Sequence, residues 1–373
     1  MKILIVKLSS LGDVVHAMPA VQDIRRAFPH AQIDWVVERG FAPLVRRCAG
    51  VHRVIECELR RWRKSPFSAP TRQAWRAFKT ELQRERYDAV IDLQGLSKSA
   101  LVAWLAKLTP NGQRMGLANQ TDGSSFEAPA RWVADVALTL PAHIHAVARS
   151  RELCARALGY AVPDQLTFGL AAPVGTAITA VEYVAFDGRF PKGTVALVHG
   201  TSRADKEWPL AHWVALGQRL NNRGYAVALP HGSEAEQRCA QDIADQLAGA
   251  VVWPRLGLDA LLDAMAGCAG VVGVDSGLSH MAVALDLPHV QIYNFDTAWR
   301  TGPGSQMRDG GPAESGVKPH TDLEQAAPLA SSWRAVSVFT QPTPSVDEVW
   351  QAWRVVSALP FADGLAVSAV QAT

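Results

Sequence analysis

The first 29 residues, MKILIVKLSSLGDVVHAMPAVQDIRRAFP (1–29), decide which kind of fold the chain adopts. KILIVKLS is a short apolar run that predicts a buried strand, and residues 13–28 predict a helix. Between them lies a turn rich in Ser and Gly. A buried strand that passes through such a turn into a helix is typical of the opening unit of a parallel α/β sheet.

The same alternation continues to residue 158. Strands are expected at QIDWVVER (32–39), HRVIECEL (52–59), YDAVIDLQG (87–95) and QRMGLA (113–118), and helices over residues 70–86, 97–108 and 143–158. Residues 160–193 then contain Pro, Gly and Ala with weak periodicity, which predicts a linker.

After the linker the alternation starts again. Strands are expected at TVALVHGTS (194–202), YAVALPHG (225–232), AVVWP (250–254), AGVVGVDSG (269–277) and HVQIYN (289–294), with helices between them, and SVDEVWQAWRVVSAL (345–359) predicts a closing helix. The expected fold class is therefore α/β, with two doubly wound parallel-sheet domains in tandem. The expected boundaries are 1–165, a linker at 166–193, 194–340, and a closing helix and tail at 341–373, for which packing back across both domains is one arrangement.

Composition narrows the class of protein. The 373 residues are 48% apolar and 19% charged with a net charge of +2, which is typical of a globular protein and does not favour bulk nucleic-acid binding. Five scattered cysteines without a C-x-x-C pair do not indicate a disulfide framework or a zinc site. No apolar run suits a signal peptide or a membrane span, so we expect a cytoplasmic protein.

Three loops at predicted strand ends are candidate sites, because open parallel sheets bind ligands beyond the carboxyl ends of their strands. They are the opening loop with Ser9, Ser10, Gly12 and Asp13, the loop HGTSRADKEWP (199–209), and the loop GVDSGLSHMA (273–282).

The loop at 273–282 best suits a phosphate. Ser276, Gly277 and Ser279 are small and leave backbone N–H groups open where a helix begins, and His280 adds a further donor. Asp275 either caps that helix or reaches a sugar hydroxyl. A plain capping role for Asp275 and Ser276 is the alternative.

The loop at 199–209 offers the hydroxyls of Thr201 and Ser202 and the cation of Lys206. The chain contains no G-x-x-x-x-G-K-[ST], no G-x-G-x-x-G after a strand and no D-x-D. A diphosphate would therefore have to be neutralised by Lys206 and the helix terminus, and we expect neither a metal nor another cofactor.

Asp13 does not suit a phosphate loop, since a carboxylate repels a phosphate. If the diphosphate binds in the second domain, Asp13 can accept a proton from an acceptor hydroxyl. The alternative is that Asp13 only caps its helix, and both interpretations remain open.

The segment RRWRK (60–64) gathers Arg60, Arg61, Arg63 and Lys64 around an aromatic residue. Charge runs are usually solvated faces, but aromatic residues among arginines favour an anionic surface such as phosphorylated lipid headgroups or an acidic sugar.

Taken together, KLSSLGDVVHAMP, RRWRK, YDAVIDLQGLSKSA, HGTSRADKEWP and VDSGLSHMAVALD resemble the lipopolysaccharide heptosyltransferases over nearly the whole chain. The resemblance implies a GT-B fold of two Rossmann-like domains. It also implies metal-independent, inverting transfer of L-glycero-D-manno-heptose from ADP-heptose to the Kdo region of the inner core on lipid A, as the first heptose. Such an enzyme would be peripheral to the cytoplasmic side of the inner membrane and would bind no nucleic acid.

The resemblance also implies roles for individual residues. Asp13 matches the general base, and Lys206 the lysine on the donor phosphates. The remaining donor-binding matches are Thr201, Ser202, Glu236, Leu256, Asp275, Ser276, Gly277, Leu278 and His280, and the acceptor-binding matches are Ser9, Ser10, Gly12, Arg60, Arg61, Arg63 and Lys64.

One loop departs from the family pattern. After Gln120 and Thr121, where members tend to carry a basic residue, this chain has DGSS (122–125). Three other functions remain open: a transferase that adds a later heptose or another sugar, a non-catalytic protein that binds nucleotide-sugars or lipid headgroups, and a GT-B sugar epimerase.

Overall fold

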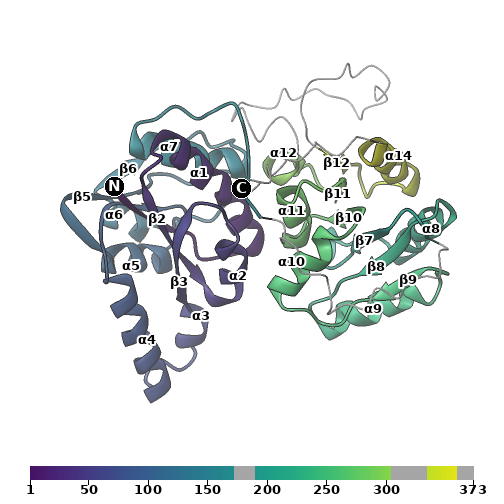
Figure 1. Ribbon diagram of the computed structural model, residues 1–373, viewed down its shortest axis with the longest axis horizontal. Helices are drawn as coiled ribbons and strands as arrows, with labels where there is room; N and C mark the ends of the chain where they lie inside the picture. The colour runs from purple at the N-terminus through teal and green to yellow at the C-terminus, as the bar shows by residue number, and fades with distance from the viewer. Residues whose placement is uncertain (172–189, 304–333, 359–373) are drawn as a thin grey trace, which may run out of the picture.

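The computed structural model describes residues 1–171, 190–303 and 334–358. Within these ranges, twelve strands form two six-stranded parallel sheets that lie side by side (Figure 1). The middle of the predicted linker, residues 172–189, and the tail beyond residue 358 lie outside the described residues. The predicted α/β class with two doubly wound parallel sheets is confirmed.

The first sheet has the strand order β3-β2-β1-β4-β5-β6. Its central strand β1 is almost wholly buried because helices cover both faces, so its residues form a continuous apolar run. The strands are β1 (Lys2–Val6), β2 (Gln32–Glu38), β3 (Val51–Cys57), β4 (Arg86–Asp92), β5 (Lys107–Leu117) and β6 (Val136–Leu138). The helices are α1 (Leu11–Ala27), α2 (Ala42–Arg46), α3 (Leu59–Trp62), α4 (Ala69–Leu82), α5 (Ser97–Leu105), α6 (Ala128–Val133) and α7 (Ala146–Leu158).

The second sheet repeats this order as β12-β11-β10-β7-β8-β9. Its strands are β7 (Thr194–Val198), β8 (Ala226–Leu229), β9 (Ala250–Val252), β10 (Gly270–Val274), β11 (His289–Tyr293) and β12 (Ala335–Phe339). The helices are α8 (Leu210–Asn222), α9 (Glu234–Ala244), α10 (Leu258–Ala266), α11 (Gly277–Ala284), α12 (Ala298–Thr301) and α14 (Val346–Ala358). In each sheet the order reverses between two neighbouring strands, β1 and β4 in one and β7 and β10 in the other, and ligands bind at such a switch point.

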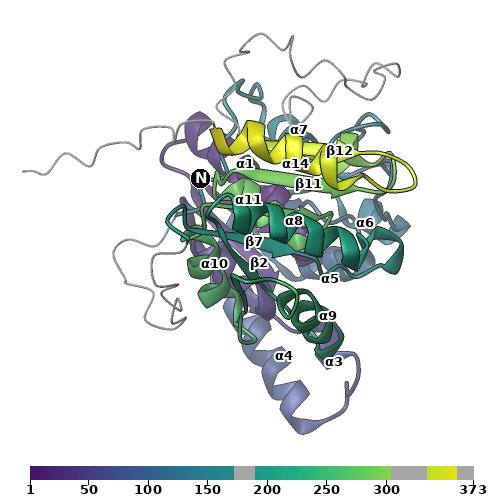
Figure 2. The same ribbon diagram turned by 90° about the vertical axis from the view of Figure 1, so that its right-hand side faces the viewer.

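The closing helix α14 belongs to the second sheet. It packs on β11, β12 and α8 (Figure 2), and it buries Val349, Trp353 and Val356. Of the apolar stripe expected from the sequence, Val349 and Trp353 are buried, whereas Val346 and Trp350 are partly buried. None of the helices in the described part of the chain is long and apolar enough to cross a bilayer.

Helices α1 and α11 join the two sheets. Their N-termini meet so closely that a Cβ added at Gly12 would lie 2.6 Å from Cδ2 of His280, and one added at Gly277 would lie 2.8 Å from Leu11. At these distances a larger residue at either position would force the neighbouring side chain or helix to shift, so glycine allows the close approach. The loops that follow β1 and β10 are therefore brought together at one place.

Some boundaries differ from the sequence-based expectation. The predicted helix over 97–108 ends at Leu105, and Lys107 already begins β5, because Lys107 and Leu108 pair with Arg86 and Tyr87. The predicted strand over 52–59 ends at Cys57, and Leu59 already begins the short helix α3, which includes the first three residues of the basic segment. Strands β6 and β12 were not expected, and they complete the outer edges of the sheets.

Candidate active site

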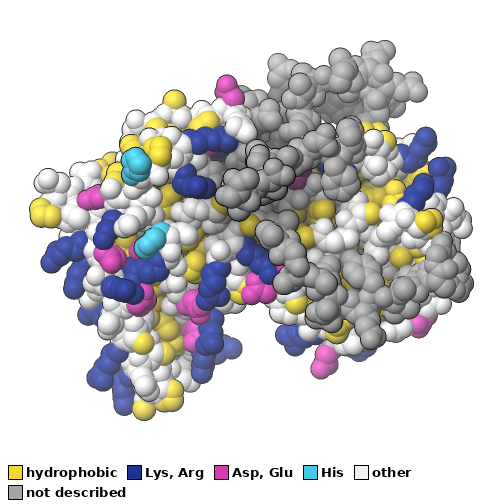
Figure 3. Space-filling model, viewed as in Figure 1, with side chains coloured by type: hydrophobic (Ala, Val, Ile, Leu, Met, Phe, Trp, Pro, Cys, Tyr) yellow, Lys and Arg dark blue, Asp and Glu magenta, His cyan; other side chains and the backbone are white. Residues whose placement is uncertain are grey.

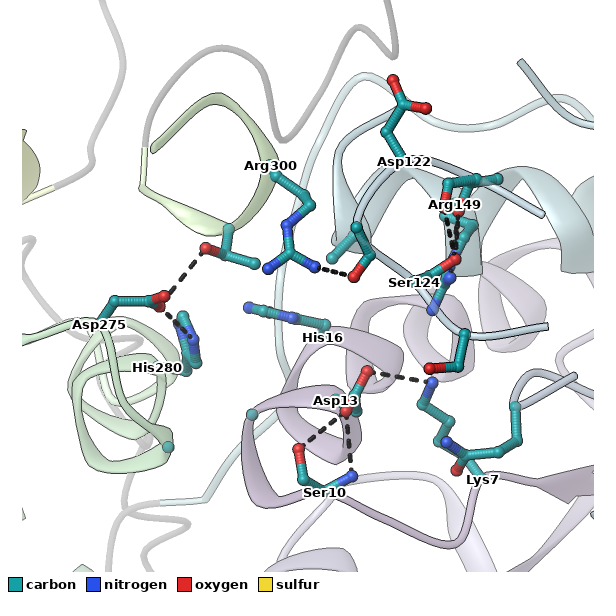
Figure 4. A pocket seen from close by; sticks show the side chains of 18 of the residues that line it. Lys7, Ser10, Asp13, His16, Asp122, Ser124, Arg149, Asp275, His280 and Arg300 are labelled. Atoms are coloured by element: carbon teal, nitrogen blue, oxygen red, sulfur yellow. Dashed lines mark hydrogen bonds and ion pairs between the residues drawn. The ribbon is translucent and has the colours of Figure 1, made fainter. Parts of the chain in front are cut away.

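A cavity of about 310 Å³ lies where the two switch points face each other. Both halves of the chain line it, and Figure 4 shows side chains from each half pointing into it. The sequence-predicted residues that line the cavity are Ser10, Gly12, Asp13, Ser202, Lys206, Asp275, Ser276, Gly277 and His280.

Asp13 lies in the first turn of α1 and is half-buried. Its Oδ2 accepts hydrogen bonds from the backbone N–H of Ser10 at 3.0 Å and from the Ser10 hydroxyl at 2.8 Å. The carboxylate therefore satisfies an N–H group at the helix start, as the capping interpretation requires. Its Oδ1 lies 3.4 Å from Nζ of Lys7 and bonds no other group in the described part of the chain, so capping leaves one oxygen facing the cavity.

Lys7 follows β1 and is almost fully buried. Its Nζ donates to the Leu93 carbonyl at 3.1 Å and lies 3.4 Å from Oδ1 of Asp13. Burial lowers the pKa of Lys7. Burial also raises the pKa of Asp13, but the attraction of Lys7 and the hydrogen bonds from Ser10 outweigh it, and the net effect lowers the pKa of Asp13. Asp13 is thus held ionised and able to accept a proton.

Asp275 follows β10 and is buried. It forms an ion pair with Lys206, which belongs to the loop at 199–209. Its Oδ1 lies 3.4 Å from Nε2 of His280 and accepts a hydrogen bond from Thr301 at 3.4 Å. Burial raises the pKa of Asp275, but His280 and Lys206 reverse this and lower it. Asp275 therefore pairs with Lys206, and its carboxylate accepts no hydrogen bond from the backbone of the following helix within the described residues.

The N-terminus of α11 is open toward the cavity. Ser276 is its N-cap residue and makes no side-chain capping bond, and the Ser276 hydroxyl is buried without a hydrogen-bond partner among the residues that the structure describes. A buried polar atom without a partner is uncommon and points to a ligand group. Together with the unpaired N–H groups of the helix terminus, this hydroxyl is suited to a phosphate oxygen.

His16 lies one turn after Asp13, and its ring packs edge to face on His280 with centroids 4.3 Å apart. Burial, with smaller contributions from His280 and His145, lowers the pKa of His16. The His16 ring is therefore neutral and acts as a wall between the two halves.

The other predicted donor-binding residues lie in the second half but do not line this cavity. A Cβ on Gly200 would lie 2.7 Å from the carboxyl carbon of Glu236, so Glu236 rests against the loop that contains Thr201. Glu236 accepts from the backbone N–H of Gly232, and the Ser233 hydroxyl accepts from the backbone N–H of Glu236 at 3.2 Å. Leu256 and Leu278 are partly buried against the core.

The basic segment 60–64 lies outside the cavity. Arg60, Arg61, Arg63 and Lys64 are exposed around the buried Trp62, which packs on Trp75 and Phe78 of α4. Figure 3 shows Lys and Arg side chains gathered over the region of α3 and α4. Arg60 also reaches the opening loop, where its Nη2 lies 3.3 Å from Oγ of the buried Ser9. The segment therefore flanks the loop that carries Asp13.

Several cavity residues were not predicted from the sequence, among them Lys7, His16, Arg149 and Arg300. His16 was detectable, because it stands three residues after Asp13 on the same helix face. Lys7 directly follows β1, and nothing in the local sequence distinguishes it from an ordinary lysine at a strand end. The two arginines reach the cavity only because segments far apart in the sequence pack together.

No three His, Cys, Asp or Glu side chains within the described ranges come together as a metal site would require.

Comparisons with known proteins agree with this architecture. The family model described as glycosyltransferase family 9 (heptosyltransferase) matches residues 75–310. The lipopolysaccharide heptosyltransferase 1 of Escherichia coli (strain K12) is 40% identical over 297 residues, which are 79% of this chain and 88% of that protein.

Two solved structures are also similar to the chain. The structure of E. coli heptosyltransferase WaaC with ADP has a TM-score of 0.76 and 31% identity, and the match covers 95% of this chain and all of that one. The structure of WaaC with ADP-2-deoxy-2-fluoro heptose has a TM-score of 0.66 and 36% identity, and the match covers 78% and 88% of the two chains. The arrangement of two Rossmann-like domains is thus the GT-B fold that was expected.

Proposed function

The chain belongs to glycosyltransferase family 9 (heptosyltransferase), and we propose that it transfers L-glycero-D-manno-heptose from ADP-heptose to the Kdo region of the lipopolysaccharide inner core on lipid A. One observation carries the proposal: a single cavity has the carboxylate of Asp13 on one wall and Lys206 with the open terminus of α11 on the other. Sugar transfer from a diphosphate to a hydroxyl requires a base on one side and positive charge on the other.

The donor is assigned to the second half. Its diphosphate binds Lys206, the Ser202 hydroxyl and the α11 terminus, where the unpaired hydroxyl of Ser276 supplies a hydrogen bond. Lys206 exchanges its carboxylate partner for phosphate oxygens. The remaining assignments are Glu236 for the ribose, Leu256 for the adenine, and Thr201, Asp275, Gly277, Leu278 and His280 for shaping the donor pocket.

The reaction is a single displacement with inversion. A Kdo hydroxyl oxygen attacks the anomeric carbon, its proton passes to Oδ1 of Asp13, and the bond from carbon to phosphate oxygen breaks with its electron pair leaving on ADP. Lys206 and the N–H groups of α11 stabilise the charge that grows on the leaving phosphate. No step in this scheme uses a metal.

The acceptor is assigned to the first half, with Ser9, Ser10 and Gly12 shaping the loop. The exposed cations Arg60, Arg61, Arg63 and Lys64 attract its anionic headgroup and hold the protein at the cytoplasmic face of the inner membrane. Co-sedimentation with anionic vesicles tests this localisation, and binding that does not weaken with salt would contradict it.

The decisive experiment measures ADP release from ADP-heptose with deacylated Kdo-lipid A as acceptor. We expect turnover with this pair and little with UDP- or GDP-sugars. Binding of ADP-heptose without turnover would favour a non-catalytic protein, and turnover of the donor without acceptor would favour an epimerase. Turnover only with an acceptor that already carries a heptose would assign the enzyme to a later step.

A further inference from the structure

Arg149 is a buried cation on the wall of the cavity. It lies in the first turn of α7 and is 6% exposed, and its Nη1 donates to Oγ1 of Thr121 at 3.2 Å. Among the described residues it forms no ion pair with a carboxylate. A guanidinium has five N–H donors, so this one retains donors for a ligand in the cavity.

Arg300 reaches the same place from the other half of the chain. It lies on α12, which follows β11, and its Nη1 donates to the carbonyl of Gly123 at 2.6 Å. Gly123 has a positive φ of 64°, and a Cβ there would lie within 2.9 Å of the Arg300 guanidinium. Glycine at 123 therefore lets the arginine lie directly on the loop at 119–125, which contains no Lys or Arg of its own.

The two arginines are not neutralised by the acids around them. Asp122 is turned to His143 at 3.3 Å, and Asp275 is paired with Lys206 and His280. Asp13 attracts Arg149 but is held by Lys7 and Ser10. Burial and the nearby charge of Arg300 both lower the pKa of Arg149. Two like charges facing one cavity in this way are costly unless an anion joins them.

We propose that Arg149 and Arg300 together bind the carboxylate of the acidic acceptor sugar, and so position its hydroxyl at Asp13. The inference rests on the proposed function and names two binding residues beyond it. The two guanidinium groups come from opposite halves, so the acceptor carboxylate bridges the halves of the protein (Figure 4).

A sugar carboxylate suits this position better than a phosphate of the donor. The donor phosphates have their own cation, Lys206, and their own helix terminus. Arg149 instead stands on the wall of the first half, together with Asp13 and Thr121. A planar carboxylate accepts paired hydrogen bonds from guanidinium groups, which fixes its orientation as well as its position.

The test combines a change in the protein with a change in the acceptor. Arg300→Met removes a half-exposed side chain and should not prevent folding. Arg149→Met removes the buried guanidinium on the wall that carries Asp13, so it tests the proposal more directly. Each should raise KM for deacylated Kdo-lipid A about 10- to 100-fold, as expected for the loss of a charged hydrogen bond, and leave KM for ADP-heptose unchanged. Arg156→Met, an exposed arginine of the same helix paired with Glu152, is the matched control and should behave as wild type.

The acceptor arm uses the methyl ester of the Kdo carboxylate. Wild type should lose affinity for the ester by the same factor as the variants lose for the acid, and the variants should no longer distinguish ester from acid. Removing the lipid A phosphates should affect wild type and variants equally.

The inference is overturned if the variants keep the wild-type KM for the acceptor, if they still distinguish ester from acid as wild type does, or if their defect depends on the phosphates. Absence of wild-type turnover with the unmodified acceptor would instead overturn the proposed function.

Discussion

The imidazole rings of His16 and His280 stand edge to face with centroids 4.3 Å apart, one on α1 and the other on α11. This contact places the N-termini of two helices from different sheets side by side. Each terminus carries partial positive charge and unpaired N–H groups. At α1 the carboxylate of Asp13 offsets this charge, whereas the N-cap residue of α11 makes no side-chain capping bond. This difference supports the proposal that one wall accepts a proton and the other binds an anion.

Replacing Asp13 by Asn tests its role as the base. Asn retains an oxygen that can accept from the N–H of Ser10, so the helix start is preserved, but it cannot take a proton. We expect kcat to fall about 10²- to 10⁴-fold, with the Kd for ADP-heptose and the melting temperature close to wild type. Steady-state kinetics and calorimetry check this. A variant with near-normal kcat would show that Asp13 only caps its helix.

Lys7→Met tests how the Asp13 carboxylate is kept ionised. Lys7 is the strongest influence that lowers the pKa of Asp13, whereas burial raises it. Without Lys7 the pKa of Asp13 rises, so the acid limb of kcat/KM moves to higher pH. The measurement is the pH dependence of kcat/KM for both proteins. An acid limb at the wild-type position would show that Lys7 acts on folding alone.

Lys206→Met removes the cation assigned to the leaving phosphate. We expect weaker binding of ADP and a fall in kcat of about 10²- to 10³-fold, the usual cost of losing a group that stabilises developing charge. Arg203→Met is the matched control, because Arg203 lies three residues away, is exposed and pairs with Asp205. Equal effects of the two substitutions on ADP affinity would mean that Lys206 attracts ADP only through the overall electrostatic potential and does not contact its phosphates.

Gly277→Ala tests the close approach of α1 and α11. The new Cβ would lie 2.8–2.9 Å from side-chain atoms of Leu11, including its Cβ, so the helices have to separate. We expect a loss of about 1–3 kcal/mol in the free energy of unfolding, together with a higher KM for ADP-heptose. Gly40→Ala, where the added Cβ meets nothing within 4 Å, is the control and should change neither quantity.

The buried histidines predict how stability depends on pH. His289 is fully buried and donates to the Val271 carbonyl, and burial lowers its pKa to about 4, as it also does for His145. In the unfolded chain these rings take up protons near pH 6.5, so the free energy of unfolding falls as pH drops from 6.5 to 4, by about 3 kcal/mol per histidine. Urea titrations at several pH values across this range give the free energy of unfolding. Its decrease with falling pH should be smaller for His289→Asn than for wild type. An unchanged slope would contradict the assignment.

The sequence predicted much of the fold because its determinants are local. Continuous apolar runs such as KILIV and GVVGV define strands buried on both faces, and the Ser/Gly turns after them define the switch points. Strand β6 has only three residues, and β5 starts inside a segment with good helical character. Pairing with the neighbouring strand therefore determined that both segments are strands. Pairing is a tertiary effect that local propensity does not contain.

The candidate site was likewise predictable only where its residues follow a strand in the sequence. Asp13, Lys206 and Asp275 were found because each follows a strand. Arg149 and Arg300 are far apart in the chain and converge only on the loop at 121–123. Nothing near either arginine in the sequence marks it, since an arginine on an amphipathic helix is ordinarily solvated.

We expect the pairing of Lys206 with Asp275 to protect the proposed donor site from small competing anions. An incoming anion has to displace a carboxylate that is already in place, and inorganic phosphate offers only its charge in return. A nucleotide-sugar adds contacts from its base, ribose and sugar, so it can complete the exchange at a concentration where free phosphate does not. Abundant inorganic anions should therefore be weak inhibitors. Selectivity for the donor then arises in part because smaller anions cannot displace Asp275 from Lys206.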